Sequence, residues 1–186
     1  LASLTELKTL KIPDIGAHSY DIPMAKLVDL FSKLKKLEKV EIKMEDNFPS
    51  DEAVKSLLNN NPNFHHLDIT PSGCYYSVNT YRGIDVLSSS SLDLIADMRP
   101  QLTDIGIGHL ESFRDTSITK LVTKCPKLRH ANFEGTDFSN SALAMMSRNC
   151  PDLEYLNITG CRDVTEEALE RFADPATAAN LKHLCI

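Results

Sequence analysis

A short apolar motif, with apolar residues at its first, fourth and sixth positions, recurs seven times along this chain of 186 residues. The first copy is Leu7, Leu10 and Ile12. The copies begin at residues 7, 37, 64, 102, 128, 153 and 181, at intervals of 30, 27, 38, 26, 25 and 28 residues. A period of this length indicates a repeat protein, because one unit of about 25 residues cannot bury its own apolar side chains and must stack on its neighbours.

The segments between the motifs have the periodicity of helices. An apolar triad at positions i, i+3 and i+4 occurs in each of the six segments, and the sixth triad is displaced by two residues. The triads are Leu27/Leu30/Phe31, Val54/Leu57/Leu58, Leu92/Ile95/Ala96, Ile118/Leu121/Val122, Leu143/Met146/Ser147 and Leu169/Phe172/Ala173. Prolines at 62, 100, 126 and 151 stand two residues before a motif, where each would end the preceding helix.

Alternating strand motifs and helices at this period predict an α/β leucine-rich-repeat solenoid. We expect about seven repeats in a horseshoe arc, with a parallel sheet on the concave face and helices on the convex face. Residues 1–186 are predicted to form a single domain of this kind. The sequence begins shortly before the first motif and ends on the last apolar position of the seventh. Repeat proteins need polar terminal caps, and neither end has one, so we expect the chain to be a segment of a longer protein.

The third repeat is about a dozen residues longer than its neighbours, and the surplus falls at residues 71–91. Insertions in repeat proteins map to loops, often on the binding face. This insertion contains Tyr75, Tyr76, Tyr81 and Arg82, and such side chains commonly anchor interfaces. We predict that these four residues contact a partner; the alternative is a loop whose tyrosines cover apolar surface at the edge of a helix.

Composition narrows the functional classes. The formal net charge of −6 argues against nucleic-acid binding, and no apolar run reaches the roughly 18 residues that span a bilayer. The five cysteines form no C-x-x-C pair, and Cys125 and Cys150 occupy the same repeat position, which suits small buried side chains in a reducing compartment. We therefore predict an intracellular protein of the cytoplasm or nucleus that binds neither membrane nor nucleic acid.

Residues at the third and fifth positions of each motif are expected to project onto the concave face. The third positions are Thr9, Lys39, His66, Asp104, His130, Tyr155 and His183, and the fifth are Lys11, Glu41, Asp68, Gly106, Asn132, Asn157 and Cys185. A mixed polar face of this kind is typical of protein recognition. We predict partner contacts at His66, Asp68, Asp104, His130, Asn132, Tyr155, Asn157 and His183.

Three of the six histidines share the third-position row, which raises the alternative of a metal or catalytic cluster. Neighbouring strands are about 4.8 Å apart, and Asp104 or Tyr155 separates the histidines, which leaves them roughly 10 Å apart. Ligands of one zinc ion lie about 2 Å from it, so we predict no metal site. A contact of Asp104 with histidines on both sides is the remaining interpretation.

Gly106 and Gly108 are expected to lower the relief of the concave face in the fourth repeat, so that a peptide or loop of a partner can lie there. The chain contains no G-x-S-x-G, phosphate-binding glycine loop, H-E-x-x-H or kinase motif. We therefore predict a protein without enzymatic activity or a cofactor.

The segments from Cys125 to His130 and from Cys150 to Cys161, followed by residues 163–169, resemble the cysteine-containing leucine-rich repeats of F-box proteins. The match is close from about residue 115 to 173, and further back Asn61 and Arg99 replace the cysteine. In that family an N-terminal F-box binds the Skp1 adaptor of a cullin-RING ubiquitin ligase, and the repeats select the substrate.

The resemblance implies a substrate-recognition arc of a ubiquitin ligase. The sequence contains no F-box, so the Skp1 and cullin machinery would be bound through a region outside it. One alternative is a non-catalytic scaffold or assembly factor that uses the same concave surface. Another is an arc attached to an enzyme that lies outside this segment.

Overall fold

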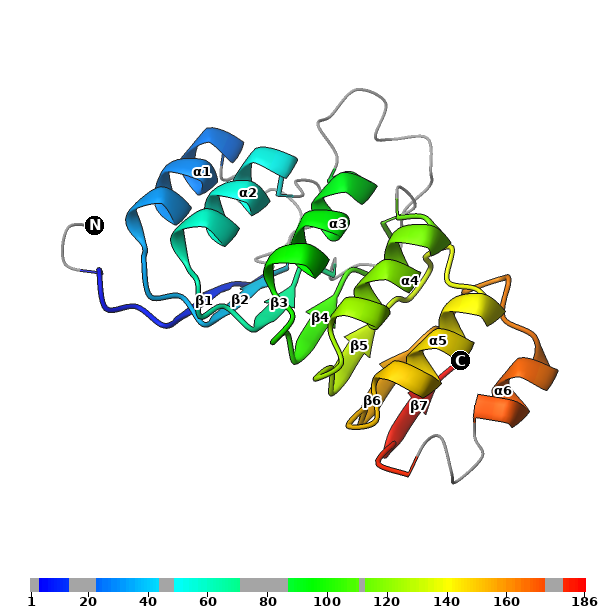
Figure 1. Ribbon diagram of the computed structural model, residues 1–186. Helices are drawn as coiled ribbons and strands as arrows, with labels where there is room; N and C mark the ends of the chain where they lie inside the picture. The colour runs from blue at the N-terminus through cyan, green and yellow to red at the C-terminus, as the bar shows by residue number, and fades with distance from the viewer. Residues whose placement is uncertain (1–3, 14–22, 44–48, 71–86, 111–112, 173–178) are drawn as a thin grey trace.

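The computed structural model describes residues 4–13, 23–43, 49–70, 87–110, 113–172 and 179–186 (Figure 1). Within these residues strands and helices alternate along the chain. They are β1 (Thr9–Ile12), α1 (Met24–Lys33), β2 (Lys39–Ile42), α2 (Asp51–Asn60), β3 (His66–Asp68), α3 (Ser89–Met98), β4 (Asp104–Gly106), α4 (Asp115–Lys124), β5 (His130–Asn132), α5 (Asn140–Asn149), β6 (Tyr155–Asn157), α6 (Glu166–Phe172) and β7 (His183–Cys185).

The strands form one parallel sheet in the order of the chain, β1 to β7. Each strand is paired with the next so that equivalent motif positions lie side by side, as for Thr9 opposite Lys39 and Asp104 opposite His130. The described helices lie in a row on one side of the sheet (Figure 1). The predicted leucine-rich-repeat solenoid is thus confirmed, with the sheet on the concave face and the helices on the convex face.

Apolar motif residues of the inner repeats form the side of the core that belongs to the sheet. Val40, Leu67 and Leu156 at the fourth position are at most 1% exposed. The two outer copies are less well covered, and Leu184 and Ile186 in the last are 37% and 71% exposed. An outer strand has a neighbour on one side only, so the same motif buries less apolar surface there.

The helices form the opposite side of the core. The predicted triads point inward: the three residues of the second, third and fourth triads are all buried, and Leu143 and Met146 of the fifth are buried as well. The displaced sixth triad is the weakest, with Phe172 buried, Leu169 partly buried and Ala173 outside the described residues.

The residue before each proline links one repeat to the previous one. This position holds Asn61, Arg99, Cys125 and Cys150, all of them buried. Its side chain donates to the backbone carbonyl at the same position one repeat earlier: Arg99 to Asn61 at 2.9 Å, Cys125 to Arg99 at 3.4 Å and Cys150 to Cys125 at 3.7 Å. Burial raises the pKa of both thiols to about 12, so they stay protonated donors.

A second link joins the first turns of successive helices. In α2 to α5 the first residue of the helix accepts a hydrogen bond from the backbone N–H that precedes the next helix, and Asp51 does so from Ser88 at 2.8 Å. Ser89, Asp115 and Asn140 repeat this contact with Arg114, Ser139 and Thr165 at 3.4, 3.2 and 2.9 Å. Each link satisfies a backbone donor that the helix itself leaves free.

Residues 71–86, which include most of the insertion, lie outside the described residues. No described helix is long and apolar enough to cross a membrane.

Candidate functional site

The concave face is formed by the third and fifth positions of the seven motifs. Strand pairing places the third-position residues in one continuous row, in which His66 lies beside Asp104, Asp104 beside His130, and Tyr155 between His130 and His183. The predicted row is therefore assembled as expected, and no described helix covers it (Figure 1).

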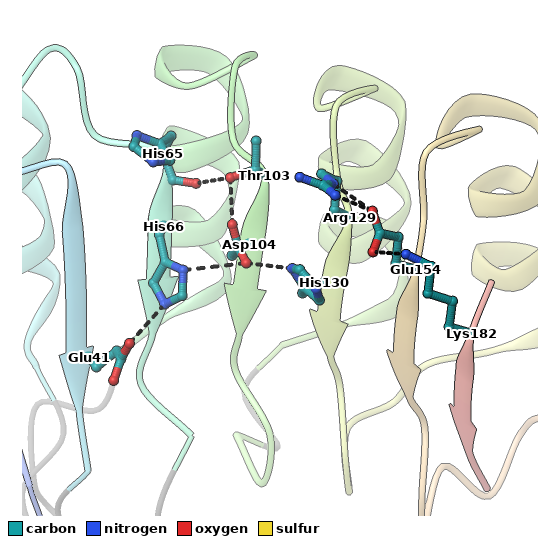
Figure 2. A network of polar contacts seen from close by, with 9 residues as sticks. All are labelled: Glu41, His65, His66, Thr103, Asp104, Arg129, His130, Glu154 and Lys182. Carbon is teal, nitrogen blue, oxygen red and sulfur yellow. Dashed lines mark hydrogen bonds and ion pairs between the residues drawn. The ribbon is translucent and has the colours of Figure 1, made fainter. Parts of the chain in front are cut away.

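Asp104 lies between histidines of the two neighbouring strands (Figure 2). Its Oδ1 atom is 2.7 Å from Nδ1 of His130 on β5 and 3.4 Å from Nδ1 of His66 on β3. Its Oδ2 atom accepts a hydrogen bond from Thr103 at 2.5 Å. The two histidines therefore converge on a carboxylate between them, the interpretation that strand spacing left open.

The ionisation of Asp104 follows from these contacts. Burial raises its pKa, but hydrogen bonds from His66, Thr103 and His130, together with the charge interaction with His66, outweigh burial. The pKa of Asp104 therefore lies well below its usual value, and the side chain is a carboxylate throughout the physiological range.

His66 extends this network toward the N-terminal repeats. Its Nε2 atom lies 3.5 Å from Oε1 of Glu41 on β2, is buried, and has no hydrogen-bond partner among the described residues. Oε2 of the same glutamate pairs with Lys11 of β1 at 2.8 Å. A chain of charged and polar contacts thus runs across five strands of the concave face, from Lys11 to His130.

A row of ion pairs lies one residue before the histidine row. Lys182 donates to Oε2 of Glu154 at 2.8 Å, and Arg129 donates to Oε1 of the same carboxylate (Figure 2). These hydrogen bonds lower the pKa of Glu154 to about 2. At the other end of the row Lys8 pairs with Glu38 at 2.8 Å. Charges of alternating sign at the second motif position are the sequence signal of this row, which the prediction from motifs missed.

Three of the predicted contact residues also shape the backbone. Oδ1 of Asp68, Asn132 and Asn157 each accepts a hydrogen bond at 3.0 Å from the backbone N–H two residues later, which turns the chain after the strand. Asn157 also donates to Glu134 at 3.1 Å and is 8% exposed. Among the predicted contact residues that the structure describes, Asn157 therefore offers a partner very little surface.

Three rings stand side by side at the C-terminal end of the row. The ring centroids of His130 and Tyr155 are 6.5 Å apart, and those of Tyr155 and His183 are 6.4 Å apart. Burial is the largest cause that raises the pKa of Tyr155, and the Cys185 thiol and the Glu134 carboxylate raise it further. The hydroxyl of Tyr155 therefore remains neutral. The row offers a partner flat, partly apolar surface with polar edges.

A shallow trough of about 220 Å³ lies on the concave face around Gly106. A Cβ atom at Gly106 would collide with the carboxylate of Asp68 and the hydroxyl of Thr70, so a larger residue would have to displace these side chains. Gly108 is buried beneath Thr70, whose Oγ1 accepts its N–H at 3.3 Å, and it does not line the trough. Of the two glycines that were expected to lower this part of the face, only Gly106 therefore lines the trough. Its walls include His66, Asp68, Asp104, His130, Asn132 and Tyr155.

The remaining predicted contacts fall in the insertion. Tyr75, Tyr76, Tyr81 and Arg82 lie outside the described residues. Among the described residues, no three His, Cys, Asp or Glu side chains are grouped so that they could hold a metal ion.

Comparison with known proteins agrees with this architecture. No family model matches the sequence. An internalin of Listeria monocytogenes has a similar structure, with a TM-score of 0.56 and 13% sequence identity over 100% of this chain and 49% of the internalin chain. A chain of the yeast Rad7 and Elc1 complex is also similar, with a TM-score of 0.51 and 17% identity over 98% of this chain and 57% of that chain.

At these identities the likeness shows the fold alone. Both comparisons identify the chain as a leucine-rich-repeat type of solenoid. The chain spans about half the length of the solved proteins that it matches, 49% of one and 57% of the other.

Proposed function

We propose that this chain is a protein-interaction module that binds its partner through the concave face. The observation that carries the proposal is the in-register polar row, with three adjacent rings, on a sheet face that no described helix covers. Seven strands at about 4.8 Å give a surface roughly 30 Å wide. A surface of this width can supply the roughly 800 Å² per partner that a typical stable interface buries.

The partner-binding role that we assign is substrate recognition in an F-box type of ubiquitin ligase. Its support is the resemblance of residues 115–173 to the cysteine-containing repeats of that family. The side chain at the cysteine position donates a hydrogen bond to the preceding repeat whether it is Arg99, Cys125 or Cys150. Repeats of this type therefore continue toward the N-terminus at least to Arg99. One of the proteins with this fold, Rad7, has been crystallised in complex with another protein, Elc1. We assign the chain itself no catalytic step.

Affinity capture with the full-length protein, followed by mass spectrometry, tests both levels of the proposal. We expect captured proteins to include Skp1 and a cullin, together with a substrate that is lost in the Tyr155→Ala variant. Lys55→Ala, at an exposed position on α2, is the control and should leave capture unchanged.

The outcomes separate the candidate functions. Capture of a stable complex without Skp1 and cullin would contradict the ligase role and support the scaffold alternative. Equal capture by wild type and by variants at Tyr155, His130 and His183 would contradict the concave face as the binding surface.

A further inference from the structure

The carboxylates of the concave face differ in how their charge is balanced. Four of the six described ones pair with lysine or arginine: Glu38, Glu41, Asp68 and Glu154. Asp104 and Glu134 have only histidines as ion-pair partners among the described residues. Neither of these two carboxylates is therefore paired with a lysine or arginine in the described part of the chain, so a cation of a partner can complement them.

Asp104 lies in the same row as the three rings, beside His130, and Glu134 lies beyond the C-terminal end of β5. Asp104 forms a wall of the trough, whereas Glu134 follows β5, accepts a hydrogen bond from Asn157 and is close enough to contribute to the raised pKa of Tyr155. His109 faces Glu134 at 3.3 Å. A group that enters the trough beside Tyr155 therefore meets the carboxylate of Asp104, which lines the trough, whereas Glu134 lies outside this lining.

Nearby cations do not cancel this charge. Arg129 is hydrogen-bonded to Glu154. The hydrogen bond and the charge of Glu154 raise the pKa of Arg129 more than the charge of Asp104 does. Lys43 is paired at 2.5 Å with Asp68. Both neighbouring cations are therefore held by other carboxylates.

The size of the trough limits what it can accept. Pockets for drug-sized ligands are commonly 300 to 1,000 Å³, and this trough has about 220 Å³. A single side chain of a protein partner suits this volume better. A long cationic side chain can place its charge near Asp104 and its methylene groups or guanidinium plane against Tyr155.

We propose that the trough receives a lysine or arginine side chain of the protein partner, paired with Asp104 and packed on Tyr155, while Glu134 adds negative charge from beyond β5. This inference rests on the proposed function, because it takes the concave face as the binding surface. It specifies the chemistry of the partner, which presents an extended segment or loop with a basic residue at its centre.

Phage-displayed random peptides of 12 residues, selected on the immobilised chain at pH 7.5, provide the probe. Selection on wild type is expected to enrich peptides with lysine or arginine, and parallel selection on the Asp104→Asn/Glu134→Gln variant is not. The matched control, Glu52→Gln/Glu170→Gln, changes the net charge equally at exposed carboxylates of the helices α2 and α6, away from the concave face. It should select the same basic peptides as wild type.

Calorimetric titration of a selected, synthesised peptide then measures the effect of each charge. We expect binding to weaken about tenfold in the Asp104→Asn/Glu134→Gln variant and when citrulline or norleucine replaces the basic residue, since two partly exposed charge pairs together amount to that factor. Heat denaturation of each variant verifies that it is folded.

The results distinguish this inference from the function on which it rests. Peptides that require Tyr155 but bind equally well to the Asp104→Asn/Glu134→Gln variant would overturn the inference and leave the binding face intact. Peptides that bind the Tyr155→Ala variant as tightly as wild type would contradict the binding face itself.

Discussion

Asp104 on β4 contacts side chains of both neighbouring strands. Its carboxylate accepts hydrogen bonds from Thr103 and His130 and faces His66. We expect Asp104→Asn to lower the free energy of unfolding at pH 7 by about 1 to 3 kcal/mol, because hydrogen bonds to a charged group are lost. Urea denaturation of both proteins measures the difference.

The pH dependence of this difference has a definite sign. The pKa of Asp104 is depressed in the folded protein, so its stabilisation is complete above the unfolded value of about 3.9 and is lost as the pH falls below it. The gap between wild type and Asp104→Asn should therefore narrow below about pH 4. A gap that widens under acid conditions would show that the carboxylate is not stabilised by the fold.

Adjacent residues of β6 should respond in opposite ways to truncation. Leu156 is 0% exposed in the core, and Tyr155 lies on the concave face. We expect Leu156→Ala to cost about 2 to 5 kcal/mol of stability, and Tyr155→Ala to cost much less while it weakens partner binding. Thermal denaturation and partner capture measure the two effects, and equal destabilisation by both substitutions would contradict the assignment of faces.

At the scale of the elements, helix starts are joined by side chains that act across repeats. Asp51 at the start of α2 accepts hydrogen bonds from the backbone and hydroxyl of Ser88 and from the hydroxyl of Ser91. Burial raises its pKa, but these hydrogen bonds outweigh burial and lower it. The contacts fix α3 against α2 at the helix end nearest the insertion.

We expect Asp51→Ala to destabilise the protein by about 1 to 3 kcal/mol, because three hydrogen bonds to a carboxylate are lost. Glu52→Ala removes a neighbouring, exposed carboxylate from the same helical turn and should cost less than about 1 kcal/mol. Chemical denaturation compares the two. A similar loss in both variants would indicate that helix-dipole stabilisation, and not the link to α3, accounts for the effect.

The whole molecule is stabilised by stacking, so equivalent substitutions should depend on their place in the array. Leu67 on β3 and Leu184 on β7 occupy the same motif position but are 1% and 37% exposed. We expect Leu67→Ala to cost about 2 to 5 kcal/mol and Leu184→Ala less than about half of that. Denaturation midpoints provide the comparison, and equal losses would show that β7 is covered as completely as the inner strands.

Much of the architecture was predictable at the level of single positions. The apolar motifs, the proline-terminated helices and the row that contains His66, Asp104, His130 and Tyr155 all follow from local spacing. Sequence spacing did not predict that Arg99 takes the place of a cysteine by donating to the same repeat position, nor that Thr70 covers Gly108. Those outcomes depend on side-chain conformations in neighbouring repeats.

The sequence by itself determined the period of the array, the face to which each strand residue belongs and the order of the concave rows. It did so because strand side chains alternate with a period of two and repeats of similar length stack in register. Only the tertiary structure decided how the carboxylates are paired: Glu154 pairs with Arg129 and Lys182, whereas among the described residues Asp104 and Glu134 pair with histidines only. Ion pairing between residues some 25 positions apart depends on distances of a few ångströms, which repeat spacing does not specify.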